Sequence, residues 1–262
     1  MSATTSAARY RGLSEKPIIV TGAGQGIGRA VALMLGQQMA KVTVADLDLD
    51  RARTVSDEIN AAGGTSMACQ VDVADPDSAE RMIESSAAEH GGVEGVVNNA
   101  AMFSTLGMGT FDAIDPVEWD AVHAVNLRGV WAVAKAAKSR LTVAGSRGSM
   151  VNMSAGAVWM GRAGYAHYVS SKAGVVGLTR VLARELGEYD VRVNSLAPGP
   201  VSTGIARATV TPEQHEKMTQ DQCIHRLATP EDLVGPIAFL LSDDARFLTG
   251  QSIHVDGGLV LN

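Results

Sequence analysis

Residues Thr21–Gly28 read Thr-Gly-Ala-Gly-Gln-Gly-Ile-Gly, directly after a short apolar run and at the start of a helical pattern. Glycine permits a tight turn and a close approach to pyrophosphate, and the following helix N-terminus offers unpaired N–H groups. Ile27 stands where the common dinucleotide fingerprint has its third glycine, and the Gly-Lys-Ser/Thr of a P-loop is absent. The stretch therefore predicts a strand, turn and helix that bind a dinucleotide.

The rest of the chain alternates short apolar runs with longer helical patterns. This alternation predicts an α/β fold, a Rossmann-like doubly wound parallel sheet of about seven strands with helices on both faces. Strands are expected at Pro17–Thr21, Lys41–Ala45, Ser66–Val71, Gly95–Asn98, Ser149–Met153, Val191–Leu196 and Ser252–Val255. Helices are expected at Gly26–Met39, Leu49–Ala62, Pro76–His90, Val117–Leu141, Tyr165–Gly187 and Pro230–Leu241.

The chain has 262 residues, of which 46% are hydrophobic and 19% charged, and this composition is that of a globular protein. No linker or repeat divides it, so we expect one dinucleotide-binding and catalytic domain over residues 17–262. Residues 1–16 are rich in Ser, Thr and Ala and lack an apolar core of the signal-peptide kind, which predicts a loose tail. The stretch Ala197–Cys223 interrupts the rhythm and is typical of a lid or binding loop.

Several partner classes are disfavoured by composition. The net charge is −6 and no basic run could follow a phosphate backbone, which argues against a nucleic-acid partner. No apolar run reaches the ~20 residues of a membrane span. Cys69 and Cys223 form no Cys-x-x-Cys pair and the histidines form no His-Glu-x-x-His pattern, so we expect no metal site. The low cysteine content is typical of a reducing compartment, and we expect a cytoplasmic protein.

Asp46 ends the second expected strand, where a carboxylate can accept hydrogen bonds from the adenosine ribose hydroxyls. It would also repel a 2′-phosphate, and neither Gln25 nor Leu47 supplies a cation to offset that repulsion. The cofactor predicted is therefore NAD(H) rather than NADP(H). The alternative is a surface aspartate in an acidic run that merely favours a helix start. Asp72 ends the third strand in the same way and can reach the adenine amino group.

Tyr168 and Lys172 are four residues apart in the long helical pattern after the fifth strand, which puts them on one helix face. A free phenol has a pKa of about 10, and a neighbouring ammonium lowers that pKa by favouring the phenolate. The pair can therefore act as a general acid and base near neutral pH, an effect typically worth ~10²–10⁴ in rate.

These motifs, taken in order, resemble the classical short-chain dehydrogenases/reductases over nearly the whole chain. The matching residues are Thr21–Gly28, Asp72-Val73, Asn98–Ala101, Asn126, Tyr168-Val-Ser-Ser-Lys172, Pro198-Gly199 with Val201 and Thr203, and the tail that ends at Gly258. The resemblance implies hydride transfer between a nicotinamide and a secondary alcohol or ketone. It makes Tyr168 the acid/base, Lys172 a ribose ligand that lowers the tyrosine pKa, and Asn126 the anchor of a water in a proton relay.

The resemblance also implies the cofactor contacts. Asn99 and Ala100 would pass near the ribose, and Val201 and Thr203 near the carboxamide. The full set expected to bind NAD is Gly22, Gln25, Gly26, Ile27, Gly28, Asp46, Leu47, Asp72, Val73, Asn99, Ala100, Tyr168, Lys172, Pro198, Gly199, Val201 and Thr203.

The sequence departs from the family at two positions. Ala101 replaces a usual glycine, which is a mild change. Ala155 stands where the family usually has a serine that polarises the substrate oxygen, and Ser154 lies one residue earlier. Either the loop over residues 156–164 absorbs one residue and Ser154 is the catalytic serine, or Ser154 caps the backbone and the donor is missing. Loss of one such donor costs ~10²–10³ in turnover.

The interpretation is an NAD-dependent short-chain alcohol dehydrogenase or ketone reductase acting on a small molecule. The alternative is a nucleotide-binding module with little or no turnover, because of Ala155. Apolar residues after the fourth and fifth strands favour a lipophilic or aromatic substrate; these are Met102, Phe103, Trp159, Met160 and Tyr165. His167 is expected at the substrate mouth or the surface. Surplus apolar stripes on the two longest helices predict a homo-oligomer, a dimer or tetramer.

Overall fold

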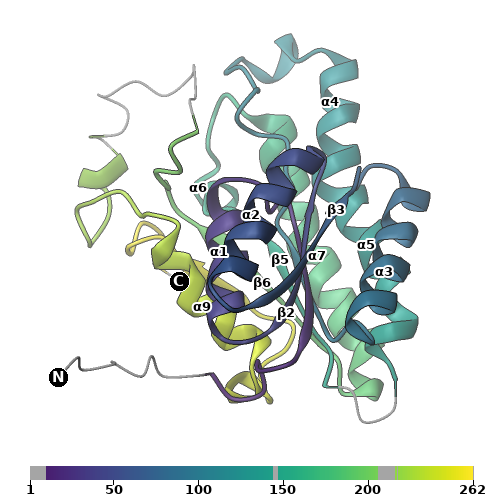
Figure 1. The fold of residues 1–262 in the computed structure, drawn as a ribbon. Helices are drawn as coiled ribbons and strands as arrows, with labels where there is room; N and C mark the ends of the chain where they lie inside the picture. The colour runs from purple at the N-terminus through teal and green to yellow at the C-terminus, as the bar shows by residue number, and fades with distance from the viewer. Residues whose placement is uncertain (1–9, 144–146, 206–215, 217, 262) are drawn as a thin grey trace, which may run out of the picture.

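A parallel seven-stranded sheet forms the centre of the protein in a computed structural model that describes residues 10–143, 147–205, 216 and 218–261 (Figure 1). The strands lie in the order β3-β2-β1-β4-β5-β6-β7. Their bounds are β1 Pro17–Thr21, β2 Lys41–Asp46, β3 Thr65–Gln70, β4 Gly95–Asn98, β5 Ser149–Met153, β6 Arg192–Pro198 and β7 Ser252–Val255. The predicted Rossmann-like doubly wound sheet is confirmed.

Helices cover both faces of the sheet. Those against one face are α1 (Gly26–Gln37), α2 (Leu49–Ala61) and α9 (Glu231–Leu241), and those against the other are α3 (Pro76–His90), α5 (Gly129–Leu141) and α7 (Ala166–Leu186). Side chains alternate along β1, so Ile18 and Val20 belong to the first core and Ile19 to the second. Burial on both faces explains why the strands have weak polar alternation.

The side of the sheet to which the chain adds strands changes at β1. After β1 it builds β2 and β3 on one side, and β4 then pairs with β1 on the other side. The loops after β1 and β4 therefore diverge at the carboxyl ends of these strands. In an open α/β sheet this topological switch point is where a ligand binds.

The long helix expected over Val117–Leu141 is interrupted. It consists of α4 (Pro116–His123), a π-helical turn over Ala124–Arg128, and α5. The Gly129 N–H bonds to the Ala124 carbonyl, five residues back, so the turn contains one extra residue. Apolar periodicity does not reveal such a turn here because the segment is apolar on more than one stripe, which hides the shift in phase that one extra residue causes. The short α6 (Ala157–Met160) is likewise absent from the sequence prediction, since four residues are too few to show a period.

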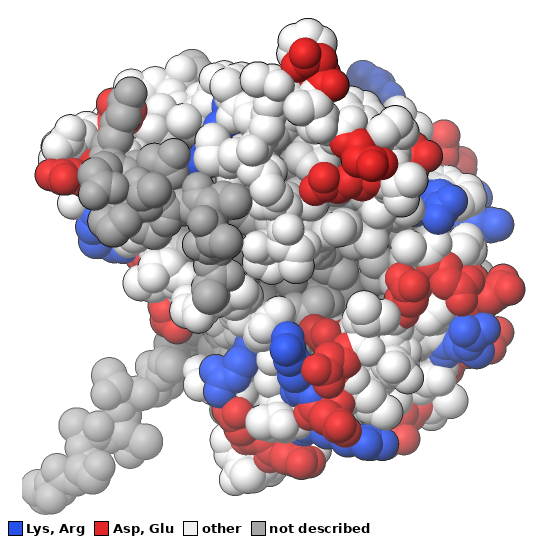
Figure 2. All heavy atoms as spheres, turned by 90° about the horizontal axis from the view of Figure 1, so that it is seen from above, with Lys and Arg blue, Asp and Glu red and all other residues white. Residues whose placement is uncertain are grey.

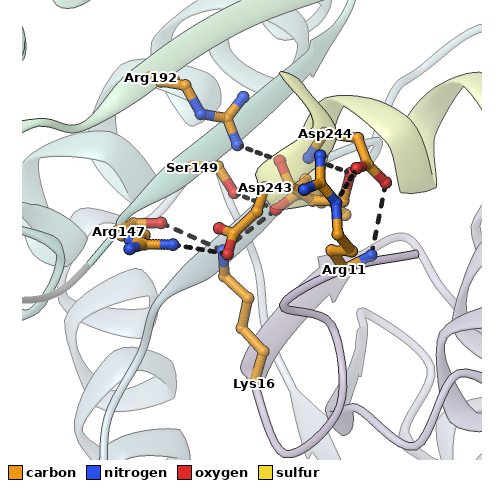
Figure 3. A network of polar contacts seen from close by, with 9 residues as sticks. Arg11, Lys16, Arg147, Ser149, Arg192, Asp243 and Asp244 are labelled. Atoms are coloured by element: carbon orange, nitrogen blue, oxygen red, sulfur yellow. Dashed lines mark hydrogen bonds and ion pairs between the residues drawn. The ribbon is translucent and has the colours of Figure 1, made fainter. Parts of the chain in front are cut away.

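Residues 10–16 correct the prediction of a loose tail over residues 1–16. Leu13 is fully buried in the core beneath α1 and α9, and Lys16 is only 5% exposed. Arg11 bonds to Asp244, close to the other end of the chain (Figure 3). A single leucine among polar residues has no periodicity, so the sequence gives no sign of this packing. Residues 1–9 of the predicted tail lie outside the described residues.

Two buried cations hold the C-terminal end of α9 (Figure 3). Lys16 Nζ donates to the carbonyls of Leu241 and Arg147 at 3.0 and 3.1 Å. The Arg192 guanidinium donates to the carbonyls of Leu240 and Ser242 at 2.6 and 3.0 Å. Positive groups stabilise a helix C-terminus, where carbonyls lack partners within the helix. Burial lowers the pKa of the Lys16 amine to about 8.

The molecular surface is mixed in charge. Figure 2 shows Asp and Glu side chains interspersed with Lys and Arg around the face seen from above. Every helix among the described residues is too short or too polar to serve as a transmembrane span. Most of the predicted lid, from residue 206 to 215 and residue 217, lies outside the described residues.

The substitution Leu13→Ala tests the N-terminal packing. We expect it to lower the free energy of unfolding by about 2–5 kcal/mol, because it leaves a cavity beneath α1 and α9. Urea denaturation followed by circular dichroism measures the change. The matched control is Leu261→Ala, at a side chain that is 80% exposed, and it should shift stability by less than about 0.5 kcal/mol. Equal, small effects of the two substitutions would contradict the packing of Leu13.

Candidate functional site

A cleft of about 740 Å³ opens at the carboxyl ends of the strands. The predicted site residues that line it are Gly22, Gln25, Gly26, Ile27, Asp46, Leu47, Asp72, Val73, Asn99, Ala100, Ser154, Tyr168, Lys172, Pro198, Gly199, Val201 and Thr203. Gly28 and Asn126 are buried beside the cleft without lining it. The fold thus brings segments from all along the chain to one place.

The glycine-rich loop is held by backbone contacts that leave no room for side chains. A Cβ on Gly28 would lie 2.2 Å from the Gly22 carbonyl oxygen. Gly22 itself has φ +62°, and a Cβ there would lie 2.8 Å from the Ala100 Cα. Helix α1 can approach the end of β1 this closely only because both positions are glycine.

The N-terminus of α1 has no side-chain cap. Its N-cap residue is Gln25, whose side chain makes no capping hydrogen bond. By contrast α2, α3 and α4 each begin with a capping aspartate, namely Asp48, Asp75 and Asp115. The first N–H groups of α1 and its positive dipole end therefore face the cleft, and this arrangement fits the pyrophosphate of a dinucleotide.

The loops after β1 and β4 are tied together. The Asn99 side-chain amide donates to the carbonyls of Thr21 and Gly22, both at 3.0 Å. The Thr21 hydroxyl in turn accepts from the backbone N–H groups of Asn99 and Ala100, both at 3.1 Å. These four bonds fix the two sides of the switch point against each other.

Asp46 is oriented by the backbone. One carboxylate oxygen accepts from the Gly24 N–H at 2.8 Å and the other from the Asp48 N–H at 3.0 Å. Asp46 therefore lies against the glycine-rich loop rather than among the solvated acidic side chains of α2. Asp72, at the end of β3, also lines the cleft, and its carboxylate accepts from the Ala74 N–H at 2.9 Å.

Arg51 lines the same end of the cleft and was not identified from the sequence. Its Nε lies 3.1 Å from the Asp48 carboxylate, one turn back on α2. Its place in the first turn of a helix that begins beside Asp46 is the signal that would have identified it.

Tyr168 and Lys172 both project from the N-terminal half of α7 into the cleft. Lys172 Nζ lies 6.0 Å from the centroid of the Tyr168 ring and donates to the Met153 carbonyl at 2.8 Å. The Tyr168 ring also packs on the Phe103 ring, with centroids 4.4 Å apart. The two side chains are thus held at one end of the glycine-lined cleft.

Burial changes the ionisation of Lys172. The side chain is only 2% exposed, and desolvation lowers the pKa of its amine to about 8. The charged ammonium still predominates at neutral pH. A fixed positive charge this close favours the phenolate form of a tyrosine.

Asn126 lies in the π-helical turn and is fully buried. Its side chain accepts from the Met102 N–H at 2.8 Å and donates to the Met102 carbonyl at 3.1 Å. It also donates to the Ser171 hydroxyl at 3.3 Å. Asn126 therefore joins the loop after β4 to α7, and π-helical turns often occur at functional sites for such purposes.

Ser154 and Ala155 both line the cleft, but the serine hydroxyl has a backbone partner. Ser154 Oγ donates to the Lys172 carbonyl at 3.0 Å. The pairing of β5 with β6 continues past Met153, through bonds from the N–H groups of Ser154 and Gly156 to β6 carbonyls at 2.8 Å. The residues up to Gly156 are therefore in regular register, and the single hydroxyl hydrogen of Ser154 is directed to the backbone.

The apolar residues expected to surround the substrate divide into two groups. Met102, Phe103 and Met160 line the cleft. Tyr165 is instead 1% exposed in a small core, and Trp159 packs edge-on against His254. His167, expected at the substrate mouth or the surface, is also buried at 1% exposure. Its Nε2 lies 3.5 Å from the Glu118 carboxylate, so α4 covers it.

Comparison with known proteins identifies the family. A family model described as enoyl-(acyl carrier protein) reductase matches residues 22–260. This chain belongs to the short-chain dehydrogenase/reductase family. It is an oxidoreductase of that family.

Relatives in this family differ in substrate. An uncharacterized oxidoreductase of Mycobacterium tuberculosis is 40% identical, with 94% of this chain and 98% of the relative covered. The L-rhamnose 1-dehydrogenase (NAD(P)(+)) of Azotobacter vinelandii is 37% identical over 95% of this chain and 98% of its own. A 3-oxoacyl-(acyl-carrier-protein) reductase of Staphylococcus aureus is 36% identical over 94% and 98%.

A solved structure agrees with the fold. A protein of Sinorhizobium meliloti, provisionally described as a short-chain alcohol dehydrogenase, superposes with a TM-score of 0.88 at 29% identity. The match covers 94% of this chain and 96% of the other.

Among the described residues, no cluster of His, Cys, Asp and Glu could hold a metal ion.

The substitution Gly28→Ala tests the dinucleotide cradle of this short-chain dehydrogenase/reductase. The added Cβ must push α1 away from the Gly22 carbonyl, so we expect NAD affinity to fall at least tenfold and the melting temperature to fall with it. Isothermal titration calorimetry and thermal unfolding measure the two effects. The matched control is Gly177→Ala in α7, where a Cβ meets nothing within 4 Å and affinity should not change. Unaltered NAD binding by Gly28→Ala would contradict the cradle.

Proposed function

We propose that this protein is an NAD(H)-dependent oxidoreductase that interconverts a secondary alcohol and a ketone. The observation that carries the proposal is the position of Tyr168 and Lys172 in the same cleft as the uncapped N-terminus of α1. An acid/base pair beside a dinucleotide cradle is the arrangement that such a reaction requires. Membership of an oxidoreductase family supports it.

The residues of the chain have separate tasks in this reaction. A nicotinamide dinucleotide, when bound, supplies the group that accepts or donates hydride. Lys172, fixed on the Met153 carbonyl, keeps a positive charge beside Tyr168. During oxidation the Tyr168 phenolate takes the proton from the alcohol, and during reduction the Tyr168 hydroxyl gives that proton to the ketone oxygen. Asn126 is a positioning residue that holds the Met102 loop against α7.

Ser154 is proposed to have a structural rather than a catalytic role. Its hydroxyl donates to the Lys172 carbonyl and so helps to fix α7 against β5. Because Ala155 has no hydroxyl, the substrate oxygen then receives a hydrogen bond from Tyr168 and none from the side chain at position 155. The missing donor lowers turnover. A nucleotide-binding module with little or no turnover is the second candidate, and Ala155 is the observation that favours it.

The proposed cofactor is NAD(H) rather than NADP(H). The Asp46 carboxylate lies at the loop where the adenosine ribose would bind and would repel a 2′-phosphate. Arg51 is the one cation at this end among the described lining residues, and its guanidinium is paired with Asp48. Asp72 is proposed to contact the adenine, and Val201 and Thr203 the carboxamide.

We propose a substrate with a substantial apolar part. Besides Met102, Phe103 and Met160, the cleft is lined by Met218 and Leu259. Flexible methionine side chains adapt to varied apolar shapes. The sugar and acyl-carrier substrates named for the relatives belong to those proteins.

We also propose that the protein is cytoplasmic and that copies of the chain associate with one another. Val122 and Val133 are fully buried, whereas Trp119, Trp131 and Val181 are 38–51% exposed on α4, α5 and α7. These three side chains carry the surplus apolar surface that the sequence predicted on the long helices. A second copy of the chain would cover them in a homodimer or tetramer.

The function is tested by supplying NAD⁺ or NADP⁺ with a panel of secondary alcohols and following reduced cofactor by absorbance at 340 nm. We expect turnover with NAD⁺ well above that with NADP⁺. Tyr168→Phe should lower kcat by about 10²–10⁴ because it removes the proton-transfer group. The control Tyr189→Phe alters an exposed ring outside the cleft lining and should leave kcat unchanged. Turnover that survives Tyr168→Phe would refute the assignment.

The substitution Ala155→Ser separates a weak enzyme from a binding module. Restoring a hydroxyl at this position should raise kcat by about tenfold or more, since one donor to a developing oxyanion is worth ~10²–10³. The double variant Ser154→Ala/Ala155→Ser should keep that gain if Ser154 only caps the backbone. A loss of all activity in Ser154→Ala with the fold intact would instead make Ser154 catalytic.

A further inference from the structure

One positively charged side chain that lines the cleft has no task in the proposed reaction. The positively charged side chains among the described lining residues are Arg51, Arg162 and Lys172. Arg51 is paired with Asp48, and Lys172 donates to the Met153 carbonyl. Arg162 has no carboxylate within ion-pair distance among the described residues.

Among the described residues, the surroundings of Arg162 take up little of its hydrogen-bonding capacity. Its Nη1 donates to the Met218 sulfur at 3.7 Å, and its guanidinium carbon lies 5.2 Å from the centroid of the Tyr165 ring. A thioether is a weak acceptor, whereas a guanidinium carries five N–H donors. The ring fixes the guanidinium plane by a cation–π contact and takes none of the remaining donors.

Arg162 lies on the same wall as Tyr168. It follows α6 in the loop that leads to α7, and Tyr165 packs on Phe103 with centroids 5.7 Å apart. Phe103 in turn packs on Tyr168. A series of aromatic contacts through the buried Tyr165 therefore connects the guanidinium to the proton-transfer group.

The acidic residues of the cleft lie on its other side. Asp46, Asp48 and Asp72 follow β2 and β3, on one side of β1 in the sheet. Arg162 follows β5, on the opposite side. The substrate end of the cleft thus has a positively charged, partly buried group and no described carboxylate to neutralise it. Arg162 is half-buried, so water solvates its guanidinium in the free protein and an anionic ligand can replace that water.

We propose that Arg162 binds an oxyanion carried by the substrate, so that the substrate is an alcohol or ketone with a carboxylate or phosphate on an apolar chain. This inference rests on the proposed function and narrows it. A guanidinium fork matches the two oxygens of a carboxylate or phosphate, and the charge strengthens each hydrogen bond. Met102, Met160 and Leu259 would contact the apolar chain between the carbonyl and the anion.

The test compares charged and neutral substrates that are otherwise matched. Aliphatic oxo acids whose chains lengthen by one methylene are assayed with NADH beside their methyl esters, and hydroxyacetone phosphate beside hydroxyacetone. At the best chain length, the wild type should prefer the anion by about 10- to 100-fold in kcat/KM. The carboxylate and phosphate arms show which oxyanion is bound.

Three variants locate the preference. Arg162→Gln should abolish it by raising the KM of the anions to the values of their neutral partners, and Arg162→Lys should retain part of it. The matched control Arg246→Gln, at an exposed arginine outside the lining, should behave as wild type. A wild type that prefers esters, or an Arg162→Gln variant that still prefers the anion, would overturn the inference.

A binding measurement separates this inference from the proposed function. Calorimetric titration of the best anion and its neutral partner into Tyr168→Phe, saturated with NAD⁺, reports recognition without turnover. Binding to Tyr168→Phe that favours the anion and depends on Arg162, together with a wild type that turns over none of the compounds, would uphold the oxyanion site and refute the reaction. Turnover of neutral ketones, with no preference for anions in either assay, would uphold the proposed reaction and refute the oxyanion site.

Discussion

The contact between Gly28 and the Gly22 carbonyl is the constraint on which the rest of the site depends. It sets helix α1 directly above the end of β1, closer than any side chain would permit. This approach directs an uncapped helix N-terminus at the switch point of the sheet, where Asn99 and Thr21 tie the two diverging loops together. A binding site for a dinucleotide therefore results from backbone packing, and the side chains around it refine what is bound.

The second part of the site is the pair Tyr168 and Lys172, which α7 positions rather than the glycine-rich loop. A single helix carries Tyr168 and Lys172 one turn apart, and two elements hold that helix in place. β5 contributes the Met153 carbonyl and the Ser154 hydroxyl, and the π-helical turn contributes Asn126. The hydroxyl that the family usually directs at the substrate is absent at Ala155, while the neighbouring hydroxyl serves the scaffold.

The sequence predicts the sheet and the glycine-rich cradle well because each follows from local chemistry. Apolar runs of strand length and a glycine at every crowded position leave few alternatives, and the strands begin and end within about two residues of the prediction. Features that depend on distant contacts are not predictable in this way. Leu13 is buried in a core that includes α9 from much later in the sequence, and apolar residues on more than one stripe hide the extra residue near Asn126.

Residues of the cleft show the same division. Asp46 and Tyr168 are recognisable from the strand or helix position they occupy. Arg51 and Arg162 are surface arginines by sequence, and only the folded arrangement separates the one that meets a carboxylate from the one that does not. The sequence leaves open whether the loop after Ser154 contains one extra residue. The pairing of β5 with β6 shows the backbone position of Ser154, and with it the partner of its hydroxyl.

The attachment of residues 10–16 has a consequence for synthesis on the ribosome. Lys16 and Arg11 precede the first strand, yet their partners Leu241 and Asp244 follow β6 in the sequence. On the ribosome the ammonium of Lys16 therefore stays hydrated until α9 has been translated. The N-terminal segment locks only after α9 has emerged and folded, so translation products that stop before α9 are left with an open, unlatched core.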